Sequence, residues 1–260
     1  MGADWDNGNL QKKAAKAGVI GGRPIGMKFD RQQGYAFQKF LMEVGTEFMR
    51  VLKPGGFLVC FSQARLYHRA ATAFEDVGFE IRDMFAWQHN GQAKAFTQNH
   101  FVMRDKNTSQ ATKAKIIADM EGRKTPQLKP QLEPMVFAQK PREGTFVENW
   151  LKWKTGLVDT TQSLDSTFPG TLMPVAKPNK KEKGDYNNHL TVKPINLLAH
   201  LIRLLTLEGQ VVLDPFLGSG STAIAAIQSG RNYIGIEKEK ENFDICQKRI
   251  DECEKIVKLL

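Results

Sequence analysis

The chain has 260 residues, of which 41% are hydrophobic and 25% charged, enough for one large α/β domain with or without a small insert. No apolar run approaches the ~18 residues that a membrane span needs, and residues 1–18 lack the apolar core of a signal peptide. The three cysteines do not have the spacing of a metal site. We therefore expect no metal, no membrane and a reduced, cytoplasmic setting.

The formal net charge is +9, and it is unevenly distributed. Residues 88–188 contain 16 Lys and Arg against 10 Asp and Glu, so this part carries +6 of the total. A basic surplus favours an anionic partner, most often nucleic acid. The alternative is a basic surface that only contacts solvent.

In chain order, the first 35 residues predict a loop, and apolar residues at helical spacing predict a helix over 36–52. A short buried strand of the parallel-sheet type (57–61), a helix ending near Gly78 and a strand over 80–88 follow. The pattern then loosens around a polar helix at 111–120, before a strand at 134–141. The region 142–188, rich in Thr, Ser, Pro and Lys, reads as an insert. A helix (194–206), a strand, a turn, a small-residue helix, a strand and a last helix from residue 239 complete an α/β layout.

The stretch VVLDPFLGSGST, residues 211–222, carries the most informative turn. Gly218, Gly220 and Ala223 fit the dinucleotide pattern G-x-G-x-x-G/A, but that pattern alone is weak, and a phosphate loop would need a lysine here. Asp214 ends the strand beside the turn, where its carboxylate would repel a pyrophosphate. A carboxylate suits the cationic ammonium and sulfonium of S-adenosyl-L-methionine instead, with Glu237 accepting from ribose hydroxyls. A dinucleotide, or a tight turn with no ligand, remains the alternative.

The same stretch resembles the cofactor motif of DNA methyltransferases that modify exocyclic amino groups, adenine N6 or cytosine N4. YIGIE (233–237) after the turn and HLTVKP (189–194) before it match that family's neighbouring segments, as do VLKPGGFLVCF (51–61) and EPMVFAQKP (133–141). The motif order resembles the permuted beta group. The resemblance implies a Rossmann-like, circularly permuted S-adenosylmethionine-dependent sheet with helices on both faces. It implies a catalytic half at 1–141, a target-recognition region at 142–188 and a cofactor-binding half at 189–260.

The resemblance also implies site residues and a double-stranded DNA substrate. The expected cofactor-binding residues are Asp214, Pro215, Phe216, Gly218, Ser219, Gly220, Thr222, Glu237, His189, Thr191 and Lys193. Aromatic and basic residues in the middle region suit base stacking and phosphate contact. The expected DNA-binding residues are Trp150, Lys152, Trp153, Lys154, Lys177, Lys180, Lys181 and Lys183. The implied reaction moves a methyl group from S-adenosyl-L-methionine to an amino group of DNA, with adenine N6 the expected target.

One family feature is not found. Such enzymes hold the target amine with a loop of the type [Asp/Asn/Ser]-Pro-Pro-aromatic, because the lone pair of an exocyclic amine is delocalised into the ring and must be freed by hydrogen-bond acceptors. The 260 residues contain no Pro-Pro dipeptide, so no catalytic residue is assigned. By resemblance, the loop and a central strand would precede MGADWDNGN. A longer reading frame, a split enzyme completed by an N-terminal piece or homodimer, or a non-catalytic remnant that binds DNA or cofactor would each explain this.

Overall fold

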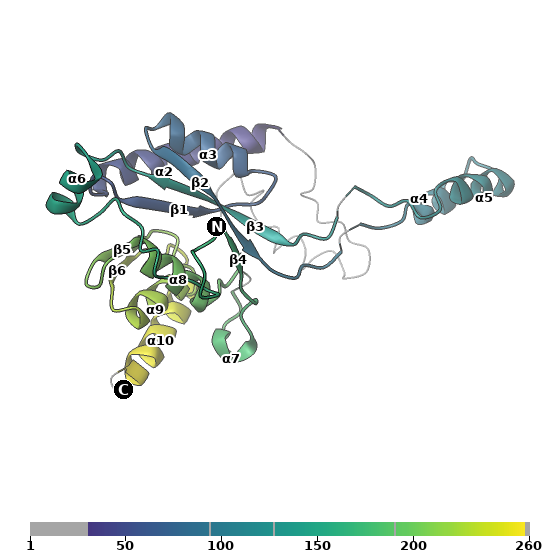
Figure 1. Ribbon diagram of the computed structural model, residues 1–260. Coiled ribbons are helices and arrows are strands. Elements are labelled where there is room, and N and C mark those ends of the chain that lie inside the picture. Colours follow the sequence, from purple (N-terminus) through teal and green to yellow (C-terminus); the bar gives the residue numbers. More distant parts are fainter. Residues whose placement is uncertain (1–30, 94, 127, 190, 258–260) are drawn as a thin grey trace.

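The computed structural model describes residues 31–93, 95–126, 128–189 and 191–257 (Figure 1). Most of the loop expected over residues 1–35 lies outside these ranges, and the first described helix begins earlier than predicted, at Arg31. The helices are α2 (Arg31–Val51), α3 (Tyr67–Asp76), α4 (Asn99–Arg104), α5 (Gln110–Asp119), α6 (Phe146–Trp153), α7 (Lys180–Lys183), α8 (Ile195–Leu205), α9 (Ser221–Gln228) and α10 (Lys240–Val257). The strands are β1 (Phe57–Phe61), β2 (Glu80–Gln88), β3 (Leu132–Gln139), β4 (Leu172–Pro174), β5 (Val211–Asp214) and β6 (Asn232–Gly235).

The described strands form two sheets. Four strands pair in the order β1-β3-β2-β4, and β5 pairs with β6 in a separate parallel pair. Strand β1, expected to be a parallel-sheet strand, pairs antiparallel with β3 along its whole length. Strand β4 comes from the region expected to be an insert, yet it pairs parallel with β2, and Met173 within it is fully buried. The region 142–188 therefore contributes a strand to the main sheet.

Because β1, β2 and β4 run in one direction, the four-stranded sheet has a distinct edge at each end of these strands. We call the edge at Phe61, Gln88 and Pro174 the carboxyl edge, and the edge at Phe57 and Glu80 the amino edge. Strand β5 starts near the amino edge, since the side chain of Gln210 donates to the carbonyl of Lys154 just beyond α6 (2.7 Å). Val212 of β5 packs in one cluster with Phe61 of the carboxyl edge, so Asp214, at the end of β5, lies toward that edge.

Helices cover both faces of the four-stranded sheet, as expected for an α/β fold (Figure 1). Alternation along β1 and β3 sends Leu58 and Val136 into one cluster with α2 and α3. The neighbouring positions, including Phe137, face a second cluster with Leu197 and Leu201 of α8. The hydrophobic core is thus divided between the two faces of the sheet.

Helix α8 also connects the two sheets. Its Leu198 and Ile202 pack on Ala225 and Ala226 of α9, next to Val212 of β5. Helix α10 packs against α9 through a third cluster that includes Cys246 and Cys253. Burial raises the pKa of the Cys246 thiol to about 11. Phe243 of the same helix is 45% exposed, and the nearby Ile245 is buried.

Candidate functional site

Asp214 lies at the carboxyl end of β5, and its carboxylate is held in place on both oxygens. Oδ1 accepts a hydrogen bond from the backbone N–H of Phe216 (3.0 Å), and Oδ2 accepts one from the hydroxyl of Thr222 in the first turn of α9 (2.6 Å). Each carboxylate oxygen keeps a further lone pair for a ligand donor. The geometry fixes a negative group beside the Gly218–Gly220 turn, as the sequence predicted.

Glu237, two residues beyond β6, brings a second carboxylate to the turn. Its Oε2 accepts from the backbone N–H of Gly218 (2.7 Å), and its Oε1 accepts from the backbone N–H of Glu239 (2.9 Å). In this arrangement Glu237 fixes the turn as well as offering acceptors to a ligand. The pairing of β5 with β6 opposes Asp214 to Gly235 and so brings the ends of both strands together.

The imidazole of His189 packs directly on the turn. A Cβ placed on Gly218 would lie 3.1 Å from His189 Nε2, so the glycine leaves room for the ring. The backbone N–H of Thr191 donates to His189 Nδ1 (3.4 Å). Burial lowers the pKa of His189, against an opposing pull from Glu237, which favours the neutral ring near pH 7. His189 therefore lies at the turn as predicted, whereas the Thr191 side chain is exposed.

The turn depends on a residue that sequence reasoning missed, Arg249 of α10. Its guanidinium is buried and donates to the carbonyl of Ser219 (2.6 Å), and also to the hydroxyls of Ser219 (3.1 Å) and Ser221 (3.3 Å). A further bond reaches the carbonyl of Glu182 in α7 (3.1 Å). Burial lowers the pKa of Arg249 from its ordinary value. In the sequence, the one sign of this role is an arginine among the Cys and Ile residues on the apolar stripe of α10.

Both glycines of the turn have positive φ, +57° at Gly218 and +85° at Gly220, a region that L side chains rarely adopt. At Gly220 a Cβ would also lie 2.7 Å from Cys246 Sγ. Gly220 begins α9, and no side chain caps that helix end. The backbone N–H groups of the first turn are thus available to an anionic group of a ligand, such as a carboxylate.

Phe216 is half exposed and lies against α2, with its ring centroid 5.9 Å from that of Phe40. Beside these rings is a groove of about 400 Å³, lined by α2 and by Leu213, Pro215, Phe216 and Ile236. Phe216, which was expected to contact the cofactor, therefore has space beside it for a ligand.

Lys193, expected at the cofactor, contacts the main sheet instead. Its ammonium forms an ion pair with Glu133 (2.5 Å) and lies 4.9 Å from the centroid of the Phe61 ring, at the carboxyl edge. Lys193 is only four positions from His189 along the chain, and a stretch of that length spans at most about 14 Å. The Gly218–Gly220 turn, which we call the cofactor turn after its predicted ligand, therefore lies close to the carboxyl edge.

The predicted DNA-binding residues fall into two separate groups. Helix α6, with Trp150, Lys152 and Trp153, is followed directly by Lys154 and docks at the amino edge. There Asn149 donates to the carbonyl of Pro54 (3.2 Å), and Gln139 donates to the carbonyl of Gly156 (3.2 Å). Lys152 and the Trp153 indole both bind Glu143 (2.6 and 3.0 Å). These residues lie at the edge opposite to Asp214.

The second group lies near the site. Lys177 follows β4 at the carboxyl edge and is close enough to His89 to help burial lower the pKa of that imidazole. Lys180, Lys181 and Lys183 lie in the short helix α7, which Asn179 caps. Through Glu182 and Arg249, α7 is tied to the cofactor turn.

Comparison with known proteins agrees with this geometry. The DNA methylase family of N6/N4 type matches residues 18–248. The type II methyltransferase M.HindIII of Haemophilus influenzae is 29% identical over 238 residues, which cover 88% of this chain and 74% of that protein. M2.DpnII of Streptococcus pneumoniae is 28% identical over 202 residues, covering 77% of this chain and 62% of that protein.

Among solved structures, the complex of M1.HpyAVI with S-adenosylmethionine has the same fold. Its TM-score is 0.56 at 22% identity, over 82% of this chain and 83% of that chain. The helices of the described residues include none long and apolar enough to cross a membrane. The match over most of the sequence, together with the carboxylate-flanked glycine turn, places the chain in the N6/N4 DNA methylase family.

Proposed function

We propose that this protein takes part in transferring a methyl group from S-adenosyl-L-methionine to an exocyclic amine of duplex DNA, with adenine N6 as the target. One observation carries the proposal: Asp214 and Glu237 flank the Gly218–Gly220 turn, each held on both oxygens by the hydrogen bonds described above. Fixed carboxylates favour a cationic ligand and oppose a pyrophosphate. The names of similar proteins, type II methyltransferases and one complex with S-adenosylmethionine, support the same reading.

The residues at the turn fit this cofactor. When bound, S-adenosylmethionine supplies an electrophilic methyl group on a sulfonium. Asp214 would hold its ammonium, Glu237 would accept from its ribose hydroxyls, and the uncapped start of α9 would receive its carboxylate. His189 packs against the turn at Gly218.

The sequence contains no Pro-Pro dipeptide, so no residue is assigned to hold the target amine. We propose that the group that holds this amine comes with a further strand lying between β1 and β5, either continuous with this chain or on a second one. Among the described residues β1 pairs on one side alone, with β3, and β5 pairs on one side alone, with β6. Such edges expose backbone donors and acceptors that need partners. The apolar side chains Val211, Ile234 and Ile236, on one face of the β5–β6 pair, are each more than half exposed. This exposure also favours a further element that covers this face.

The cofactor assignment is tested by calorimetry with S-adenosylhomocysteine and with NAD. The parent chain should bind the first and not the second, and Asp214→Ala should abolish binding. Asp244→Ala, which removes an exposed carboxylate of α10, is the matched control and should leave affinity unchanged. Binding of NAD, or normal affinity in Asp214→Ala, would refute the assignment.

The base is tested by analysing methylated nucleosides from duplex DNA treated with the chain and its completing segment. N6-methyladenine is expected, and N4-methylcytosine would correct the base. An amine-holding loop of the Asp-Pro-Pro-aromatic type in the reading frame upstream of Met1 would identify the segment. No transfer with any such segment would favour the non-catalytic remnant.

A further inference from the structure

A helical hairpin stands clear of both sheets in Figure 1. It consists of α4, α5 and the residues around them, and we call residues 97–124 the arm. Its base is closed by hydrogen bonds in both directions, since Phe96 N–H donates to Thr125 Oγ1 (3.2 Å) and Thr125 N–H donates to the Phe96 carbonyl (3.0 Å). The arm is thus a separate unit on a narrow connection to the sheet.

The connection between the arm and the sheet, which we call the neck, continues the β2–β3 hairpin beyond the carboxyl edge, from His89 after β2 and Gln131 before β3. The N–H of His89 donates to the carbonyl of Gln131 (2.9 Å). A Cβ on Gly91 would meet the carbonyl oxygen of Pro130 at 2.0 Å, so the two backbones approach as closely as only glycine permits. Because the neck leaves the carboxyl edge, the arm starts on the side of the sheet where Lys177, Lys193 and the cofactor turn lie.

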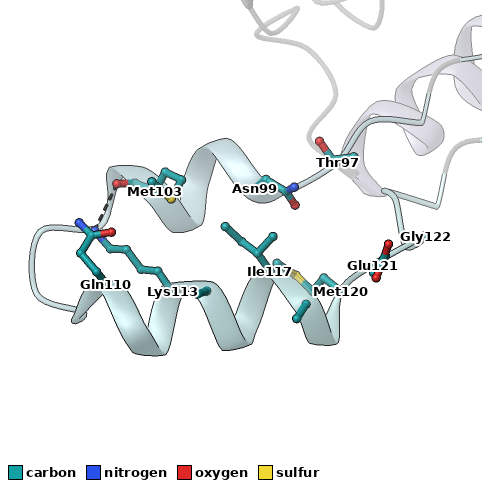
Figure 2. A pocket seen from close by; sticks show the side chains of 11 residues that line it. Thr97, Asn99, Met103, Gln110, Lys113, Ile117, Met120, Glu121 and Gly122 are labelled. Atoms are coloured by element: carbon teal, nitrogen blue, oxygen red, sulfur yellow. Dashed lines mark hydrogen bonds between the residues drawn. The ribbon is translucent and has the colours of Figure 1, made fainter.

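Local hydrogen bonds organise the arm. Ser109 caps α5 by accepting from the N–H of Thr112 (3.2 Å). The Lys113 ammonium donates to the Met103 carbonyl at the end of α4 (3.3 Å; Figure 2). A cation at this position is favoured by the helix dipole. The helices have 6 and 10 residues, below the length at which isolated helices are stable in water. A binding partner would offset that weakness.

The surface of the arm is basic. It has six Lys and Arg residues against three Asp and Glu. Five of the six are exposed, and among the described residues none of those five forms an ion pair with a carboxylate: Arg104, Lys106, Lys115, Arg123 and Lys124. Unpaired cations on a projecting element are the electrostatic pattern of phosphate contact.

We propose that the arm binds the phosphate backbone of the DNA duplex, at a distance along the duplex from the base at the cofactor turn. This inference rests on the proposed function for the identity of the partner. Contacts of this kind give affinity and orientation without reading sequence. The arm lies outside residues 142–188, where the sequence places target recognition, so it adds a second DNA-contacting element.

The test compares two full-length triple variants of equal charge change. Arg104→Gln, Lys106→Gln and Lys115→Gln neutralise the arm, and Lys39→Gln, Lys53→Gln and Lys255→Gln, at exposed lysines outside the arm and outside the predicted DNA-binding residues, make the control variant. Fluorescence anisotropy with a 30-base-pair duplex, as an illustrative length of about three helical turns, gives Kd between about 50 and 200 mM salt. The arm variant should weaken binding at least about tenfold and reduce the salt slope by about 2 to 3, roughly one per lost phosphate contact, equally for unrelated sequences. The control variant should behave like the parent.

A second variant replaces residues 97–124 with Asn-Gly, which the closed base at Phe96 and Thr125 allows, and should lose at least as much affinity. Unchanged Kd and salt slope in both arm variants would overturn the proposal, and so would an equal loss in the control variant. The competing explanation is that another protein, or a second copy of this chain, occupies the apolar groove of about 650 Å³ between α4 and α5 (Figure 2). A loss of DNA affinity that follows a change from dimer to monomer in sedimentation would favour that occupant and overturn ours.

Calorimetry with S-adenosylhomocysteine separates this inference from the proposed function. A parent chain that binds this cofactor analogue, with arm variants that keep full DNA affinity, contradicts the arm alone. A chain that binds DNA through the arm but binds no cofactor analogue contradicts the cofactor assignment alone.

Discussion

At the residue scale, the cofactor turn depends on one buried cation. Arg249 supplies donors to two carbonyls and two hydroxyls that lie under Gly218–Gly220 and α7. The carboxylates that the sequence identified can act only if this support keeps the turn in place. Arg249, which holds the turn in place, is thus thirty positions along the chain from Ser219 in the motif that predicts the site.

We expect Arg249→Met to reduce the free energy of unfolding by about 2 to 4 kcal/mol, because buried carbonyl groups would lose their donors. Affinity for S-adenosylhomocysteine should fall at least about tenfold, the equivalent of about 1.4 kcal/mol. Urea denaturation and calorimetry measure the two effects. Lys255→Met, on the exposed side of the same helix, is the control, and equal stability of the two variants would contradict the role of Arg249.

A second residue-scale prediction concerns pH. His200 is 2% exposed within α8, and burial, with Arg203, lowers its pKa from the usual 6.5. As the pH falls below about 6.5, the unfolded chain takes up a proton that the folded chain does not, so stability present above that pH is lost. The melting temperature should therefore drop between pH 7.5 and 5.5. His200→Gln should show a smaller drop across the same interval, and an identical drop would exclude His200 as a cause.

At the scale of elements, the start of α9 is constrained by backbone shape and by space together. Gly220→Ala would place a Cβ at φ +85° and 2.7 Å from Cys246 Sγ. We expect a loss of about 2 to 4 kcal/mol from strain and overpacking. The double variant with Cys246→Ala removes the overlap but not the strained φ, so thermal melting should show partial recovery. Full recovery would mean that the positive φ has no cost.

Elements with strong periodicity were predicted well from the sequence. Features that depend on pairing between distant strands were predicted less well. The α8 stripe and the strand before Asp214 were predictable from local pattern, and so was the site at the glycine turn. The antiparallel position of β1 and the addition of β4 to the sheet were not, because pairing partners lie far apart in the chain. Likewise, the opposite placement of α6 and α7 depends on which edge each loop reaches.

At the scale of the whole molecule, net charge governs the expected affinity for DNA. The surplus of +9 should make DNA affinity fall steeply with salt, as counterions are released on binding. Anisotropy from about 50 to 200 mM salt measures this slope. A flat response would refute the basic surface as a DNA contact, whichever element carries it.

The second whole-molecule prediction concerns turnover. The purified 260-residue chain should bind S-adenosylhomocysteine but transfer little or no methyl to DNA by itself, because its sequence contains no Pro-Pro dipeptide of the amine-holding type. Incorporation of labelled methyl into duplex DNA is the measurement, and Asp214→Ala is the blank. Normal turnover by the chain alone would mean that the loop lies within these residues in a form the motif does not reveal.

Helix α8 packs with one stripe against the four-stranded sheet and with another against α9 and β5. Opening this helix requires both apolar clusters to come apart, so its backbone amides can become accessible only when the molecule as a whole opens. Native-state hydrogen exchange should consequently find the slowest deuterium uptake along Ile195–Leu205, and that helix would report global unfolding for a protein built of two sheets.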